Sequence, residues 1–191
     1  MKKIGLTGGI GSGKTYVSKV FEKLGFPVFN ADNYAKEYMH TDQDLVKAII
    51  REFGSDIYKD GKLQAKVLAS IVFNDQEKLN QLNTLVHPIV KKGFIDWCFQ
   101  INSKLVIKEA AILFESDSHI GLDAVICVVC PEEIRIERVM KRDNVNRSEV
   151  LSRIDQQMDV EKQKALSSYI IVNDGKHMVV PQVLDIIKEM G

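Results

Sequence analysis

The sequence predicts an α/β fold of the doubly wound type, in which a parallel sheet of about five strands is flanked by helices. Short apolar segments alternate with longer segments of helical spacing. The apolar segments lie at 4–6, 27–29, 105–107, 124–129 and 169–172. Two of them, 105–107 and 124–129, are near-continuous apolar runs, which are typical of parallel strands covered on both faces. A glycine-rich stretch follows the first apolar segment, as in proteins that bind phosphate at the edge of such a sheet.

The segments between the strands have the apolar spacing of helices. A first helix begins near Thr15 and stops at Gly25. A second begins near Asp32, directly after the second strand. His87-Pro88 is expected at the start of a later helix, because proline suits a first helical turn.

Three further segments complete the chain. Residues 41–101 are mostly helical with no convincing strand, although Asp60-Gly61 is a turn signal. Such a long helical block indicates an inserted subdomain or a helical wall beside the sheet. Residues 132–166 are charged and helical, and 178–190 form an amphipathic closing helix.

Composition excludes several classes of protein. Basic and acidic residues number 26 each, so we expect no general attraction to nucleic acid or to membranes. No apolar run approaches membrane-spanning length. The three cysteines, Cys98, Cys127 and Cys130, do not form a disulfide framework and are expected to be buried core residues. We expect a reducing cytoplasm, and a monomer or weak homo-oligomer.

The glycine-rich stretch Gly8-Gly9-Ile10-Gly11-Ser12-Gly13-Lys14-Thr15 fits the pattern G-x-x-x-x-G-K-[ST]. Its glycines allow backbone N–H groups to surround an anion at a helix N-terminus. Lys14 would reach the β- and γ-phosphates, and the Thr15 hydroxyl would bind Mg²⁺. The alternative is a glycine-rich turn before a helix, but the strand–loop–helix context favours ATP or another nucleoside triphosphate.

A phosphate loop in a chain without a guanine-reading motif indicates a small-molecule kinase. Asp32 follows the second strand, so it is either a base that accepts the acceptor hydroxyl proton or a helix cap. Arg135, Arg138 and Arg142 share one helix face, which is either a lid that closes over ATP or a solvated surface.

Three further residues are candidates with open roles. His87 either contacts substrate or is structural, since it precedes a helix-starting proline. Glu109 ends the third strand and Glu115 follows shortly after it. Either could act on the metal through water or be an ordinary loop acid.

The sequence resembles the dephospho-coenzyme A kinase family over about Lys3 to Asn173. The loop segment Ile4 to Lys14 is similar to that family's start, and its Thr-Gly-Gly-Ile is narrower than a general phosphate loop. The other matching motifs are Ala31-Asp32, His87-Pro88, Leu113-Phe114-Glu115, Arg142-Asp143, Arg153-Ile154, Gln157 and Asn173.

The resemblance implies transfer of the ATP γ-phosphoryl group to the ribose 3′-hydroxyl of dephospho-coenzyme A, with Mg²⁺. It implies Asp32 as base or orienting group, Arg138 and Arg142 as lid cations, and Asn173 near the adenine, while His87 stays a candidate substrate contact. Contacts to ATP phosphates are implied for Gly11, Ser12, Gly13, Lys14, Thr15 and Tyr16. The expected organisation is a single domain, 1–191, comprising a core (about 1–40, 102–131 and 167–191), a helical coenzyme A-binding region (about 41–101) and a lid (about 132–166).

The sequence departs from the family pattern at four positions: Glu109 replaces a common aspartate, Ala111 a proline, Ile112 a leucine, and Arg135 a glutamine. The changes leave the role of Glu109 at the metal and the role of Arg135 open. The alternatives are a nucleoside monophosphate kinase, which would share the sheet, loop and lid, and an ATP-binding regulatory module without transfer activity.

Overall fold

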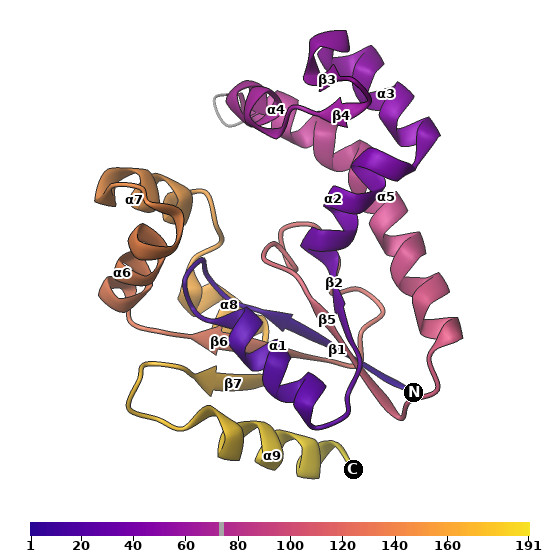
Figure 1. Ribbon diagram of the computed structural model, residues 1–191. Helices are drawn as coiled ribbons and strands as arrows, with labels where there is room; N and C mark the ends of the chain where they lie inside the picture. The colour runs from indigo at the N-terminus through magenta and orange to yellow at the C-terminus, as the bar shows by residue number, and fades with distance from the viewer. Residues whose placement is uncertain (73–74) are drawn as a thin grey trace. The chain divides into compact units, whose positions relative to one another are not determined.

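The computed structural model describes residues 1–72 and 75–191, which fold into two compact units (Figure 1). The sheet unit comprises Met1–Asn30 and Ile101–Gly191, and the helical unit comprises Ala31–Gln100. The helical unit therefore begins about ten residues earlier than the helical region assigned from the sequence. The helix after the second strand groups with it, because that helix contacts the long helix of the same unit.

The sheet unit contains a five-stranded parallel sheet, which confirms the fold class. Its strand order is β2-β5-β1-β6-β7. The strands are β1 (Lys2–Thr7), β2 (Val28–Asn30), β5 (Leu105–Glu109), β6 (Ala124–Val129) and β7 (Tyr169–Val172). Glu109 pairs in register with Leu6 on one side and Asn30 on the other. The carboxyl ends of three strands therefore meet at one edge of the sheet.

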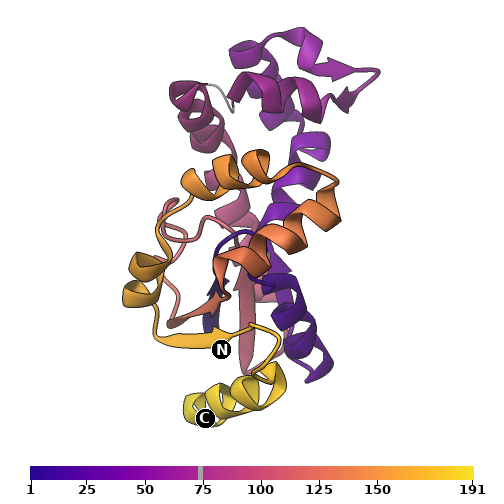
Figure 2. The ribbon, with the colours of Figure 1, turned by 90° about the vertical axis from the view of Figure 1, so that its left-hand side faces the viewer.

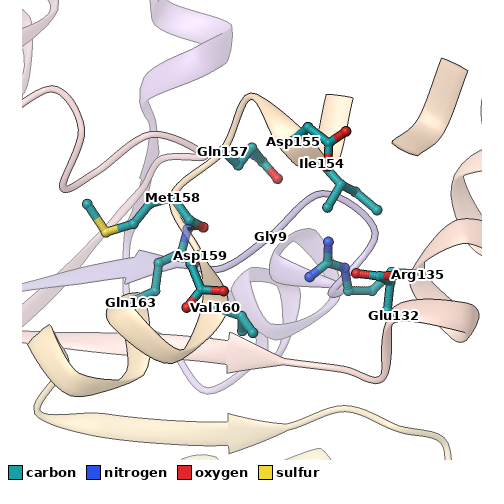
Figure 3. Close-up of a pocket in the computed structure, with 10 residues that line it drawn as sticks. All are labelled: Gly9, Glu132, Arg135, Ile154, Asp155, Gln157, Met158, Asp159, Val160 and Gln163. Carbon is teal, nitrogen blue, oxygen red and sulfur yellow. Dashed lines mark hydrogen bonds between the residues drawn. The ribbon is translucent and has the colours of Figure 1, made fainter. Parts of the chain in front are cut away.

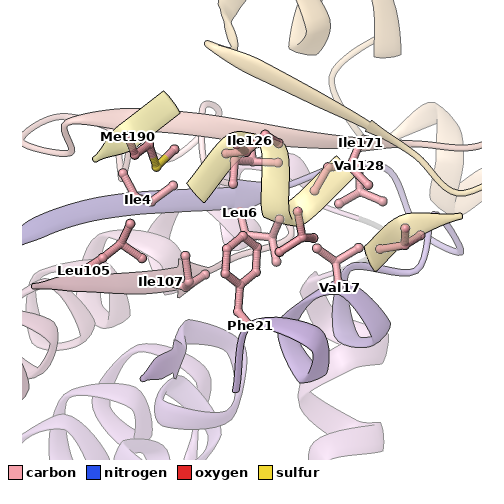
Figure 4. Close-up of a cluster of buried hydrophobic side chains, with 13 residues drawn as sticks. Ile4, Leu6, Val17, Phe21, Leu105, Ile107, Ile126, Val128, Ile171 and Met190 are labelled. Atoms are coloured by element: carbon pink, nitrogen blue, oxygen red, sulfur yellow. The ribbon is translucent and has the colours of Figure 1, made fainter. Parts of the chain in front are cut away.

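Helices cover both faces of this sheet, and Figure 2 shows α1 and α8 on opposite sides of it. The helices of the unit are α1 (Lys14–Lys23), α6 (Glu132–Asp143), α7 (Arg147–Asp155), α8 (Val160–Leu166) and α9 (Val179–Met190). The main core lies between the sheet and helices α1 and α9, where Leu6, Phe21 and Val183 are fully buried (Figure 4). Burial of such side chains is the main stabilising term for the unit.

The cysteines are buried thiols, as expected from the sequence. Cys127 lies in the middle of β6, and burial raises the pKa of its thiol to about 11. Cys130 lies just beyond the same strand, and burial raises its thiol pKa as well. Both groups are therefore protonated at neutral pH and act as small apolar core residues.

The helical unit contains α2 (Ala31–Thr41), α3 (Gln43–Phe53), the short helix η1 (Ser55–Ile57), α4 (Ala65–Val72) and α5 (Gln76–Gln100). The prediction that it lacks strands was wrong, because β3 (Tyr58–Lys59) and β4 (Lys62–Leu63) form a short antiparallel hairpin. Its turn is Asp60-Gly61, and both residues have positive φ. Asp-Gly is a favoured pair for such a turn, so the turn signal itself was right.

The expected helix start at His87-Pro88 was also wrong. Both residues lie inside α5, a single helix of 25 residues. The buried positions Val86, Val90 and Phe94 continue one apolar face across the proline. Packing of this face offsets the hydrogen bond that proline cannot donate. Within the described parts of the chain, no helix is both long and apolar enough to cross a membrane, α5 included.

Candidate active site

The phosphate loop connects β1 to α1, and its glycines are required by close packing. Gly8, Gly11 and Gly13 all have positive φ, and Gly13 caps α1 in the left-handed conformation. A Cβ atom on Gly8 would overlap the carbonyl oxygen of Val128 in β6. A Cβ atom on Gly11 would overlap the backbone of Arg135 in α6. The loop thus lies directly against two other elements, where only glycine fits.

The side chains of the loop are arranged around its own backbone. Lys14 is the first residue of α1, and its Nζ donates to the carbonyl oxygens of Gly8 at 2.7 Å and Gly9 at 3.3 Å. The hydroxyl of Ser12 is buried and lacks a hydrogen-bond partner among the described residues. A buried hydroxyl of this kind is a group that a bound phosphate would satisfy. Tyr16, by contrast, is 52% exposed at the start of α1.

Arg138 and Asn173 hold the outer side of the loop. The Asn173 Nδ2 donates to the Ser12 carbonyl oxygen at 2.8 Å. The Arg138 Nη1 donates to the Asn173 carbonyl oxygen at 3.1 Å and to that of Gly11 at 3.4 Å. The structure thus brings together two candidate residues that lie 35 positions apart. Their backbone contacts orient the loop amides that would face a nucleotide.

Ile10 connects the loop to the segment between α6 and α8. Its N–H donates to Oε1 of Gln157 at 2.7 Å, just beyond α7. Its side chain packs against a small core formed by Ile136, Val139 and Val150 of α6 and α7. Sequence reasoning quoted Ile10 and Gln157 only as matching motifs and assigned neither a role. The apolar residue inside a glycine-rich loop was the available signal.

Glu109 joins three elements beside the loop. The residue is 6% exposed, and its carboxylate accepts hydrogen bonds from Ser18 Oγ at 2.7 Å, Asn30 Nδ2 at 2.9 Å and Thr15 Oγ1 at 3.2 Å. The register of the parallel sheet places Glu109 beside Asn30, and α1 supplies the two hydroxyls. Sequence reasoning missed Ser18, which lies one helical turn after the Lys14-Thr15 pair, and Asn30, which precedes Asp32 by two positions.

The carboxylate–hydroxyl pair of Glu109 and Thr15 suits Mg²⁺, which prefers oxygen ligands and retains several waters. Among the described residues, no group of three or more His, Cys, Asp or Glu side chains could hold a metal by itself. A Mg²⁺ ion held by this pair would need phosphate oxygens and water to complete its set of ligands, as in other phosphate-loop proteins.

The remaining acidic and basic candidates of the sheet unit lie elsewhere. Glu115 accepts the N–H of Met158 through Oε1 at 3.0 Å. Arg142 lies at the end of α6 with its side chain 61% exposed, and it donates twice to Asp143. These hydrogen bonds, with one from Arg153, hold the pKa of Asp143 below its usual range. Arg142 is therefore a surface cation in this structure.

Asp32 and His87 belong to the helical unit. Asp32 is an exposed residue in the first turn of α2, two positions after β2 ends. It lies inside the helix rather than at the capping position, and a carboxylate in a first turn interacts favourably with the helix dipole. His87 is half-buried in the middle of α5. Asp32 follows directly on the sheet unit in the chain, because α2 begins where β2 ends.

The sheet has a phosphate loop after its central strand, β1, and arginines on α6, the helix that follows β6. This arrangement is that of the phosphate-loop kinases. Comparison with known protein families identifies one family within this class. The dephospho-CoA kinase family model matches residues 2–178. The chain belongs to the dephospho-CoA kinase family. Kinases of this family phosphorylate an alcohol group of dephospho-CoA in coenzyme A biosynthesis, and this is the activity of the chain.

Curated relatives span most of the sequence. A dephospho-CoA kinase of Bacteroides fragilis is 37% identical over 186 residues, 97% of this chain and 91% of the relative. One of Porphyromonas gingivalis is 39% identical over 189 residues, 98% of this chain and 94% of the relative.

Solved structures agree with these relatives. A crystal structure from Thermus thermophilus has a TM-score of 0.87 and 30% identity, and covers 99% of this chain and 97% of its own. The dephospho-CoA kinase of Campylobacter jejuni has a TM-score of 0.72 and 26% identity, and the match covers 100% of this chain and 98% of that one. A shikimate kinase from Acinetobacter baumannii, at 14% identity and a TM-score of 0.59, shares the fold alone.

Proposed function

We propose that this protein transfers the γ-phosphoryl group of ATP to the ribose 3′-hydroxyl of dephospho-coenzyme A, giving coenzyme A and ADP. The observation that carries the proposal is the phosphate loop. Lys14 donates to its carbonyl oxygens, and the Ser12 hydroxyl is buried with no partner among the described residues. Such a loop binds β- and γ-phosphates through backbone N–H groups and the lysine. The helical unit is proposed to bind the coenzyme A part of the acceptor.

Asp32 is proposed as the group that receives the proton of the 3′-hydroxyl. Its carboxylate accepts this proton as the hydroxyl oxygen forms a bond to the γ-phosphorus. The bond between the γ-phosphorus and the bridging oxygen breaks, and its electrons leave with ADP. The exposed side chain and the place of Asp32 next to the carboxyl end of β2 support this role, since ligands of such sheets bind at the carboxyl ends of strands.

Thr15 and Glu109 are proposed to hold Mg²⁺, Thr15 through its hydroxyl and Glu109 through water. The ion would neutralise charge on the β- and γ-phosphates. Arg138 and Arg142 are proposed as lid cations, Gly11 to Tyr16 as contacts to the phosphates, Asn173 as a contact near the adenine, and His87 as a substrate contact. Arg142 would have to exchange Asp143 for a phosphate oxygen, which its exposed position allows.

The proposal is tested with an acceptor panel. ADP release is measured for dephospho-coenzyme A, AMP, UMP and shikimate at equal concentrations, with product position confirmed by phosphorus NMR. We expect turnover with dephospho-coenzyme A alone, and phosphate on the 3′-oxygen. Faster turnover with another acceptor, or ATP binding without transfer to any, would contradict it. Lys14→Ala is the control, and we expect both ATP binding and transfer to weaken because charge at the phosphates is lost.

We also propose that the protein acts in the cytoplasm as a monomer or weak homo-oligomer. Buried thiols of high pKa are suited to a reducing compartment. Sedimentation of the purified chain over a range of concentrations measures the oligomeric state.

A further inference from the structure

A pocket of about 290 Å³ lies in the sheet unit beside the phosphate loop (Figure 3). It is formed by Gly9 of the loop, by Glu132 and Arg135 of α6, and by the chain from the end of α7 into α8. Lys14 is not among the described residues that line it. The Nζ of Lys14 donates instead to the carbonyl oxygens of Gly8 and Gly9.

Arg135 is a buried cation without a counter-ion. The residue is 6% exposed, and its Nε has no hydrogen-bond partner in the part of the chain that the structure describes. Among the described residues, no carboxylate forms an ion pair with it. The guanidinium is turned toward Gly9 (Figure 3), where a Cβ atom would lie 2.8 Å from Nη1. A buried charge is unfavourable unless it is paired. A bound anion would therefore stabilise the Arg135 guanidinium.

The other polar groups of the pocket are either engaged or exposed. Gln157 accepts the N–H of Ile10, and the Asp159 carboxylate caps α8 by accepting two backbone N–H groups. Glu132 and Asp155 are exposed residues that line the same pocket. The hydrogen bonds of Gln157 and Asp159 are thus made to backbone N–H groups and not to the Arg135 guanidinium. A guanidinium in such a place presents two parallel donors, the arrangement that matches a phosphate oxygen pair.

We propose that this pocket is a binding site for a phosphoryl oxyanion, with Arg135 as the residue that contacts it. Two sources share this chemistry: the terminal phosphate of the nucleotide on the loop, and free inorganic phosphate. The first source rests on the proposed function, because it requires ATP on the loop. The second does not require the kinase reaction.

The test compares Arg135→Met with the charge-retaining Arg135→Lys in the full chain. Calorimetry gives the affinities for ADP, for a non-hydrolysable ATP analogue, and for inorganic phosphate with ADP present. Loss of a charge-assisted contact is expected to weaken binding by about 10- to 100-fold. For the nucleotide source, Arg135→Met weakens the ATP analogue by this factor and ADP by less than about threefold. If free phosphate is the ligand, Arg135→Met weakens the binding of inorganic phosphate and leaves the affinities for both nucleotides unchanged. In either case, Arg135→Lys should lose less affinity than Arg135→Met.

Glu132→Gln is the control of opposite sign. Removing a carboxylate from the same pocket should strengthen binding of the anion that Arg135→Met weakens. Affinities for both the ATP analogue and phosphate that stay within about threefold in Arg135→Met would overturn the proposal. So would weakening of ADP and ATP analogue by the same factor, because that indicates general damage to the loop.

Two measurements separate failure of this site from other failures. The melting temperature without ligand should not fall in Arg135→Met, because the variant removes an unpaired buried charge. If the methionine variant does not fold, Arg135→Gln supplies the same comparison with a polar side chain. Turnover of the unchanged chain with dephospho-coenzyme A is measured first, so that failure of the proposed function is seen independently of any phosphate affinity.

Discussion

The two compact units differ in the sequence range over which their side chains interact. In the sheet unit, Asn173 and Gln157 bind the phosphate loop across 161 and 147 positions. In the helical unit, two hydrogen bonds join closer positions: Tyr58 donates to the Met39 carbonyl, 19 positions away, and Asp42 caps α3. The phosphate loop therefore depends on distant segments of the sheet unit, whereas these two hydrogen bonds of the helical unit join neighbouring segments.

The sharpest test of this difference is the candidate base in the helical unit. Asp32→Asn keeps the size of the side chain but removes the proton acceptor, and we expect turnover to fall by about 10²-fold or more. ATP binding should stay nearly unchanged, because the sheet unit carries the loop. Turnover and nucleotide affinity are measured separately. Unchanged turnover would reduce Asp32 to a residue that interacts with the helix dipole.

Two glycine variants compare the units directly. Gly11 and Gly54 both have positive φ, but a Cβ atom on Gly11 would meet the backbone of Arg135, whereas Gly54 has nothing within 4 Å. Gly11→Ala must displace the loop, and we expect a loss of about 10²-fold in turnover, as for small displacements of reacting groups. Gly54→Ala should lower the free energy of unfolding by about 1–3 kcal/mol, the scale of backbone strain in a region that glycine alone adopts readily, without changing turnover. Equal effects on turnover would show that the loop has room to adapt.

The smallest expected effect concerns Glu109. Glu109→Gln can still accept from Ser18 and Asn30 through one oxygen, while the Thr15 hydroxyl turns to accept. We expect a stability loss of about 1 kcal/mol, together with a higher Mg²⁺ concentration for half-maximal turnover. Ser18→Ala is the matched control, since it removes one hydrogen bond of similar energy and leaves the carboxylate charge. An unchanged Mg²⁺ requirement in Glu109→Gln would make Glu109 purely structural.

The sheet and the phosphate loop could be predicted because their signals are local. Apolar runs gave all five strands, and the spacing from Gly8 to Thr15 specified the loop. The β3–β4 hairpin was missed because strands of two residues have no periodicity to detect. The helix start at His87 was wrong because a local proline preference was weighed above an apolar face that continues from Val86 to Phe94.

The site was predictable only where one motif carried it. Lys14 and Thr15 were named from the loop motif and Asn173 from the family resemblance, but the hydrogen bonds that join them to other segments were not predicted. The interaction of Glu109 with Asn30 depends on strand register, and that of Ile10 with Gln157 depends on where α7 ends. Such contacts between distant segments follow from the packed sheet and leave no spacing pattern in the chain.

Ile10 has a consequence for recombining kinases of this class. Its side chain belongs to the core of α6 and α7, and its N–H is bonded beyond α7, so one loop residue is shared with the segment that follows β6. If residues 132–157 were replaced with the corresponding helices of another kinase, Ile10 would pack against side chains other than those of its own α6 and α7. Position 10 would have to be exchanged with the graft, which makes the fourth residue of the Thr-Gly-Gly-Ile sequence a compatibility marker between loop and lid.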